Sequence, residues 1–337
     1  MKALIKFILA LAGFCLVAVL AFLFVGWPKK TADVTYGASF SRPYAEELGL
    51  DPNKVLTAAL TELNIKRFRI PAYFKLVEPE RGKWDFAALD EQVKLIRGGG
   101  GQIILAVGEK LPRWPECWGP DWWKKLPREE QRQETLRYIE AVVTRYRESP
   151  AIMAWQIENE PHFAYGDCPA PEMLFIRQET NFVRGLDPKH EILTTDSGEL
   201  SSWLTLGVFV DRLGVSVYRV VRNPLFGNAN LHYWFLPPYF YARKALLLRP
   251  FGVKSIYVSE FQMEPWSNKP LNETPIQDQL GAMDLKQMRS NFSFAERMGI
   301  KAVDFWGLEW WAWMKEKGGH PEFWDEAVKF FKAANKR

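Results

Sequence analysis

At 337 residues the chain is too long for a small binding module and about right for one large α/β barrel. Its 44 basic and 40 acidic residues are interspersed and leave a net charge of +4. There is no basic stripe or arginine-rich tract, so we expect no nucleic-acid partner.

The first 30 residues differ in kind from the rest. A run of 21 uncharged residues, Phe7–Trp27, follows Lys2 and Lys6 and is itself followed by Lys29 and Lys30. At about 1.5 Å per residue, such a helix can span a hydrocarbon core of roughly 30 Å. The flanking lysines nearly balance, so they do not set the orientation.

A cleaved signal peptide is the alternative, with Val19–Ala21 as a weak cleavage site. The apolar run continues past that point, which favours a retained anchor. We therefore expect a membrane anchor over residues 1–30 and one extracytoplasmic domain over residues 31–337. If the segment is removed, the protein is secreted.

Beyond the anchor, short apolar runs alternate with longer amphipathic segments, the pattern of repeated βαβ units. The predicted strands are Val34–Phe40, Arg67–Ile70, Gln102–Val107, Ile152–Ile157, Glu191–Thr195, Leu213–Tyr218, Ser255–Ser259 and Ala302–Trp306. The predicted helices are Asn53–Leu63, Phe86–Arg97, Arg128–Glu148, Pro171–Gly185, Tyr239–Leu248, Ile276–Met298 and Pro321–Lys332.

Eight strand–helix units predict a (β/α)₈ TIM barrel, although the link from Gly198 to Arg212 is short for a full unit. A doubly wound open sheet is the alternative, but no glycine-rich phosphate-binding loop follows the first strand. In such barrels the chemistry lies at the C-terminal ends of the strands.

Two of these strand ends carry glutamates. The fourth strand leads into Glu158-Asn159-Glu160-Pro161, and the seventh leads into Glu260. Paired carboxylates are what glycoside hydrolysis requires, one to protonate the leaving oxygen and one to attack the anomeric carbon or activate water. Taken singly, either glutamate could instead be a helix cap or an ion-pair partner.

The joint pattern of Asn159-Glu160-Pro161 and Ser259-Glu260-Phe261 resembles the clan of retaining glycosidases on (β/α)₈ barrels, whose best-known members are family 5 cellulases and mannanases. The resemblance implies that Glu160 is the general acid/base and Glu260 the nucleophile. It implies a carbohydrate substrate and no cofactor.

The same resemblance assigns four further residues. Arg69 matches the arginine that hydrogen-bonds the nucleophile, and Asn159 matches the asparagine that contacts the sugar 2-hydroxyl. Tyr218 matches the tyrosine near the nucleophile, and Trp306 matches the tryptophan on which the reacting sugar stacks. Simple core packing is the alternative role for Tyr218 and Trp306.

The sequence also departs from the family 5 pattern. Ser216 occupies the place of the usual histidine before the strand-six tyrosine, and the histidine expected after strand three is missing from residues 106–112. The segment Val77–Phe86 is similar to other branches of the clan, such as families 42 and 39. These departures leave the family within the clan open.

Several other residues are candidates for the rim of the cleft. His162 could form a subsite, while Glu109 and Glu309 could bind hydroxyl groups or be simple rim charges. Strict alternation puts Glu158 on the same strand face as Glu160, but strand ends often twist or bulge, so alternation does not decide which of them faces the pocket. The motif favours Glu160, which makes Glu158 a supporting or an outward-facing residue. Tryptophans beside Pro, Gly and charged residues, as at Trp114, suit flat, partly apolar ligands such as sugars.

Cys117 and Cys168 are an even pair in the part beyond the anchor, and Cys15 lies inside the apolar run. They fall in the loops after strands three and four, and an exported domain permits a disulfide between them. Two unpaired thiols are the alternative. No Cys or His cluster has metal-ligand spacing, and we expect a monomer without a metal.

Three functions fit these residues. The first is a retaining β-glycosidase that hydrolyses an oligo- or polysaccharide through a glycosyl-enzyme. The second keeps the same residues but transfers the sugar to an acceptor, giving a transglycosylase that remodels envelope glycans. The third is a barrel that binds glycans without turnover, which the intact set of Glu160, Glu260, Arg69 and Asn159 disfavours.

Overall fold

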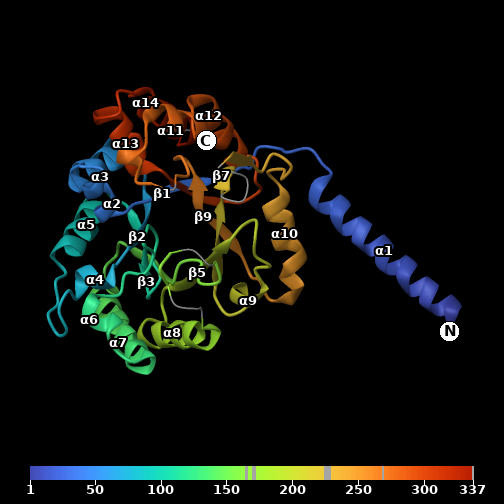
Figure 1. Ribbon diagram of the computed structural model, residues 1–337, viewed down its shortest axis with the longest axis horizontal. Coiled ribbons are helices and arrows are strands. Elements are labelled where there is room, and N and C mark those ends of the chain that lie inside the picture. Colours follow the sequence, from blue (N-terminus) through green and yellow to red (C-terminus); the bar gives the residue numbers. More distant parts are fainter. Residues whose placement is uncertain (164–165, 169–171, 224–228, 268, 336–337) are drawn as a thin grey trace.

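The computed structural model describes residues 1–163, 166–168, 172–223, 229–267 and 269–335, and at its centre lies a closed barrel of eight parallel strands (Figure 1). The strand order around the barrel is β1-β10-β9-β6-β5-β4-β3-β2. The barrel strands are β1 Thr35–Ser39, β2 Arg67–Pro71, β3 Gln102–Val107, β4 Ile152–Ile157, β5 Glu191–Ser197, β6 Arg212–Val217, β9 Ile256–Gln262 and β10 Ala302–Trp306. The predicted TIM barrel is therefore confirmed, and all eight predicted strands are present.

The helices cover the outside of the barrel (Figure 1). Those of the barrel and its loops are α2 Arg42–Glu47, α3 Pro52–Thr61, α4 Phe74–Val77, α5 Ala87–Gly98, α6 Asp121–Lys124, α7 Arg128–Tyr146, α8 Met173–Leu186, α9 Leu204–Gly207, α10 Phe240–Leu248, α11 Ile276–Ala282, α12 Leu285–Ala295, α13 Leu308–Glu316 and α14 Glu322–Ala334. The predicted helix from Pro171 begins at Met173, and Pro171 lies outside the described residues.

The strands and helices follow from their apolar patterns. In β3 every residue after Gln102 is buried, as expected for a parallel strand covered on both faces. In α5 the buried apolar residues are Leu89, Val93 and Ile96, at the three- and four-residue spacing of one helix face. That spacing packs the helix against the barrel and leaves its polar face in solvent.

Three features differ from the predicted elements. The single helix expected over Ile276–Met298 is two helices, because Asp284 caps the start of α12 by accepting a hydrogen bond from the backbone N–H of Gln287 at 2.6 Å. Helices that were not expected are α13, over Leu308–Glu316, and the short helices α2, α4, α6 and α9. An antiparallel hairpin, β7 Val220–Asn223 with β8 Ala229–His232, follows β6.

The N-terminal segment forms one helix, α1 Lys2–Phe24, which projects away from the barrel on the side of α10 (Figure 1). None of its residues is buried, and it is long and apolar enough to cross a membrane. Its end is held to α10. The Tyr239 hydroxyl donates to the carbonyl of Phe24 at 3.0 Å, and Arg243 donates to the carbonyl of Val25 at 2.8 Å.

Candidate active site

The C-terminal ends of the strands bring four of the predicted site residues into one buried network centred on Arg69. The guanidinium of Arg69 lies 2.7 Å from Glu260 Oε1 and donates to Asn159 Oδ1 at 2.6 Å and to Gln156 Oε1 at 2.6 Å. The Tyr218 hydroxyl donates to the other oxygen of Glu260, Oε2, at 2.9 Å. Arg69 is fully buried, so its charge is compensated inside the barrel rather than by solvent.

Glu160 and Glu260 are both next to Ser216 of β6. The Ser216 hydroxyl donates a short hydrogen bond to Glu160 Oε1, and the Cα atoms of Ser216 and Glu260 are partners in the pairing of β6 with β9. The residue that replaces the family 5 histidine thus contacts the predicted acid/base directly. Sequence comparison with that family shows the replacement but not this contact.

Burial raises the pKa of Glu160 to about 8, and the negative charge of Glu260 contributes to the same shift. The hydrogen bond from Ser216 opposes it, because it favours the ionised carboxylate. At neutral pH the Glu160 carboxyl is therefore protonated, the state that a general acid requires.

The turn after β4 explains how Glu160 faces this network. Glu158 and Glu160 both have left-handed backbone conformations, with φ of 58° and 41°, so the simple alternation of strand faces ends at Glu158. The backbone N–H of Glu160 donates to the Thr195 hydroxyl at 2.8 Å, and that hydroxyl donates to Asn159 Oδ1 at 3.0 Å. The turn is fixed by contacts to β5 as well as to β3.

Glu158 supports this turn. Its carboxylate accepts the backbone N–H groups of Glu109 at 2.7 Å and Lys110 at 2.6 Å, in the loop after β3. A side chain at Gly108 would meet Glu158 Oε1 at 2.4 Å, and Gly108 has φ of 135°, so glycine is required there. Glu109 itself pairs with Arg128 at 2.8 Å.

Trp306, the predicted sugar platform, ends β10 and is 8% exposed. The guanidinium of Arg113 lies between two rings, 3.9 Å from the ring centroid of Trp306 and 3.8 Å from that of Tyr44. Arg113 also forms ion pairs with Glu264 and, at 3.1 Å, with Glu309. One of the neighbours of Trp306 is therefore a charged group that the sequence did not indicate.

Glu309 and His162 lie apart from the Arg69 network. Glu309 is fully buried, and its carboxylate accepts the backbone N–H of Ser41 at 2.6 Å in addition to pairing with Arg113. His162 is part-buried, with Nε2 2.8 Å from Met173 Sδ and Nδ1 3.3 Å from the Thr205 hydroxyl. In the described part of the chain, neither side chain is hydrogen-bonded or ion-paired with Glu160 or Glu260.

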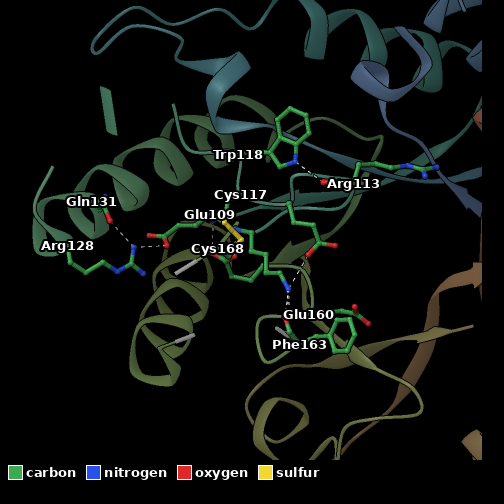
Figure 2. The surroundings of a disulfide bond; sticks show 12 residues. Glu109, Arg113, Cys117, Trp118, Arg128, Gln131, Glu160, Phe163 and Cys168 are labelled. Carbon is green, nitrogen blue, oxygen red and sulfur yellow. Dashed lines mark hydrogen bonds and ion pairs between the residues drawn. A yellow bond between two sulfur atoms is a disulfide. The ribbon is translucent and has the colours of Figure 1, made fainter. Parts of the chain in front are cut away.

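The disulfide predicted between Cys117 and Cys168 is present, with the two Cα atoms 5.1 Å apart. Figure 2 shows it joining the loop that carries Glu109 and Arg113 to the loop that carries Glu160 and Phe163. Cys15 is unpaired and exposed on α1.

Two buried residues of the first of these loops belong to the site but were not predicted from the sequence. Lys110 Nζ lies 3.1 Å from Glu116 Oε2, and both side chains are less than a tenth exposed. Burial raises the pKa of Glu116 to about 7, and the negative charge of Glu260 adds to the shift, so Glu116 is a third carboxyl group near the pair. No sequence motif indicates Lys110 and Glu116, because they come together only when the loop after β3 folds back on itself.

The described residues contain no group of three or more His, Cys, Asp or Glu side chains placed to hold a metal ion. The arrangement at this rim is instead two carboxyl groups with opposite environments. One is paired with a buried cation and a tyrosine hydroxyl, and the other is protonated at neutral pH. Two such groups can act as nucleophile and acid.

In sequence, the chain is homologous to glycoside hydrolases. It is 30% identical over 121 residues to a β-galactosidase of Halorubrum lacusprofundi and 39% identical over 92 residues to mannan endo-1,4-β-mannosidase F of Aspergillus fumigatus. These matches cover 31% and 27% of this chain but only 17% and 19% of the relatives. No family model matches the chain.

In fold, the chain is similar to (β/α)₈ glycoside hydrolases. The solved β-galactosidase of Halorubrum lacusprofundi matches with a TM-score of 0.55 and 17% identity, over 81% of this chain and 52% of that one. Endo-glycoceramidase II of a Rhodococcus species matches with a TM-score of 0.56 and 15% identity, over 83% and 75% of the two chains. At these identities the structural matches establish the barrel fold alone.

Proposed function

We propose that this chain is a retaining β-glycosidase in which Glu260 is the nucleophile and Glu160 the general acid/base. The observation that carries the proposal is the buried Arg69–Glu260 ion pair at 2.7 Å, in the same network as Asn159. The protonated Glu160 is hydrogen-bonded to Ser216, the residue of β6 that is paired with Glu260. Arg69 holds one carboxylate oxygen of Glu260, and the Tyr218 hydroxyl holds the other. This arrangement fixes the orientation of the carboxylate, which a nucleophile requires and which a purely structural ion pair does not.

The reaction proceeds in two displacements. Glu260 attacks the anomeric carbon as the bond to the leaving oxygen breaks, and Glu160 gives its proton to that oxygen. Glu160, now ionised, then takes a proton from water, whose oxygen attacks the anomeric carbon and releases Glu260 from the ester. Loss of the negative charge on Glu260 during the first step lowers the proton affinity of Glu160 when it must change from acid to base.

The relatives indicate which sugars to test as substrates. We propose β-galactosides and β-mannosides first, because named relatives are a β-galactosidase and a β-mannanase. The test uses 4-nitrophenyl β-galactoside, β-mannoside, β-glucoside and β-xyloside together with mannan. The wild type should release product from at least one, and Glu260→Ala should release none while Leu174→Ala, an exposed residue, is unchanged.

The same assay separates the other two functions. Accumulation of longer glycans when acceptor sugar is added would instead favour a transglycosylase. Binding of mannan without release of sugar, unaffected by Glu260→Ala, would favour a glycan-binding barrel and would contradict the proposal.

We also propose that α1 is a retained anchor that keeps the barrel at the outer side of a membrane. Support comes from the length and apolar surface of α1 and from the contacts that fix its end to α10. In the segment that leads into α10, Trp234 is 80% exposed, and Leu246 on α10 itself is 56% exposed. Aromatic and aliphatic side chains of this kind are stable at a membrane interface.

A further inference from the structure

Lys110 is a buried lysine that makes only contacts inside the protein. Its side chain is 6% exposed, and its ammonium donates to the carbonyl of Glu160 at 2.9 Å and to the carbonyl of Phe163 at 2.7 Å. The third contact of the ammonium is the carboxylate of Glu116 at 3.1 Å. A buried ammonium is costly unless its donors are satisfied, and here three acceptors surround it.

The backbone of Lys110 contacts the turn after β4, which carries Glu158, Asn159 and Glu160. Its N–H donates to Glu158 Oε2 at 2.6 Å, and its carbonyl accepts the N–H of Asn159 at 2.7 Å. Lys110 also pairs with Cys117 in an isolated antiparallel bridge, and Cys117 is joined by the disulfide to Cys168 in the loop after β4. One residue therefore links the loop after β3 to every position from 158 to 160.

The turn after β4 needs support from its surroundings. Two non-glycine residues in it, Glu158 and Glu160, adopt left-handed conformations, which are sterically unfavourable for residues with a Cβ atom. Such conformations persist only where surrounding contacts fix them. One of the two carbonyls that Lys110 binds is that of Glu160 itself. The side chain of the same residue accepts the hydrogen bond from Ser216.

We propose that Lys110 is a positioning residue for the acid/base, its ammonium fixing the carbonyls of residues 160 and 163 so that the Glu160 carboxyl stays aligned with the leaving oxygen. This inference rests on the proposed function. Lys110 touches no reacting atom, and it acts through the backbone of Glu160. Loss of Lys110 therefore weakens proton transfer and leaves the nucleophile on its separate support, Arg69 and Tyr218.

The test compares leaving groups. A 2,4-dinitrophenolate leaves without protonation, whereas the alcohol of a methyl glycoside requires it. In Lys110→Met, kcat/KM for methyl β-galactoside or methyl β-mannoside should fall about 100-fold, within the usual range for general acid catalysis, while kcat/KM for the matching 2,4-dinitrophenyl glycoside falls less than about threefold. Azide needs no deprotonation, so it should accelerate breakdown of the glycosyl-enzyme in this variant.

The matched control is Lys244→Met. Lys244 is a part-buried lysine whose ammonium also donates to loop carbonyls, those of Gly198 and Ser201, but after β5. Loss of Lys244 should change kcat/KM for the methyl and the 2,4-dinitrophenyl glycoside by the same factor. Azide should not accelerate breakdown of the glycosyl-enzyme in this variant. Lys110→Gln, which keeps a donor, is the second variant, and near-ultraviolet circular dichroism shows whether each variant is folded.

An equal loss for both leaving groups in Lys110→Met, or failure of both Lys110 variants to fold, overturns the inference and makes Lys110 a structural residue. Glu160→Gln separates this result from the proposed function. If Glu160→Gln shows the leaving-group split and Lys110→Met does not, only the role of Lys110 is wrong. If Glu160→Gln shows no split, or the wild type cleaves none of the four aryl β-glycosides or mannan, the proposed function itself is wrong.

Discussion

The guanidinium of Arg69 is the cation on which the predicted nucleophile depends. Replacement by methionine leaves Glu260 as a buried charge without its partner and removes donors from Asn159 and Gln156. Loss of one partner of a buried pair costs about 3–5 kcal/mol, so urea denaturation of Arg69→Met should show a decrease of that size in the free energy of unfolding. The double variant Arg69→Met, Glu260→Gln should recover part of it; no recovery would mean that the charge of Glu260 is compensated elsewhere.

If Glu160 is the general acid, as proposed, the hydrogen bond from Ser216 lowers the upper pH limit of activity. The protonated form of Glu160 is then the active one and its pKa is about 8, so kcat/KM should fall as the pH rises through about 8. The Ser216 hydroxyl favours the ionised form, so Ser216→Ala should raise the pKa of Glu160 further and move the falling limb to higher pH. A pH profile of kcat/KM for both proteins measures this, and an unmoved or lowered limb would contradict the contact.

The sequence predicted the site residues that lie at strand ends and missed those held by folded loops. Arg69, Asn159, Tyr218 and Glu260 meet in one network because the strand order of a barrel places them there. Arg113 was not predicted, because its position over the ring of Trp306 depends on the path of the loop after β3. Local residue patterns contain no information about that path.

Among the elements, the loops after β3 and β4 are joined by the disulfide, which closes a segment of 51 residues. A loop of this length limits the unfolded chain enough for the disulfide to stabilise the fold by about 4 kcal/mol. The pair Cys117→Ser, Cys168→Ser should therefore have a lower Tm by calorimetry and a slower turnover of methyl glycosides, because the two loops carry Lys110 and Glu160. Cys15→Ser is the matched control and should change neither.

The predicted elements were confirmed where a short apolar run forms a buried barrel strand, as in β3, and where apolar residues recur at helical spacing, as in α5. They failed at α13, where Leu308, Trp310, Trp311 and Met314 are all buried, because a helix that is apolar on most sides shows no amphipathic period. They also failed at the junction of α11 and α12, where the apolar pattern continues through a break that Asp284 imposes by capping.

At the scale of the whole molecule, the question is whether α1 remains attached. A retained anchor predicts that protein from cell membranes resists carbonate extraction and has an intact mass that includes residues 1–27. Cleavage after Ala21 would instead give soluble protein with a mass that lacks the apolar segment, and the anchor proposal would then be wrong. Arg243→Ala, which removes a contact between α10 and the end of α1, should not release the protein, because the bilayer rather than this contact holds it.

The central claim is that Glu260 forms a covalent bond to the sugar, and trapping that intermediate tests it most directly. A 2,4-dinitrophenyl 2-deoxy-2-fluoro-β-glycoside of the sugar that the protein cleaves keeps its good leaving group but slows the second displacement, so the glycosyl-enzyme accumulates. Peptide mass spectrometry should then find the fluorosugar on Glu260, with Glu160 unmodified. A label on another residue, or turnover without any label and with inverted anomeric configuration, would contradict the assignment of Glu260 as nucleophile.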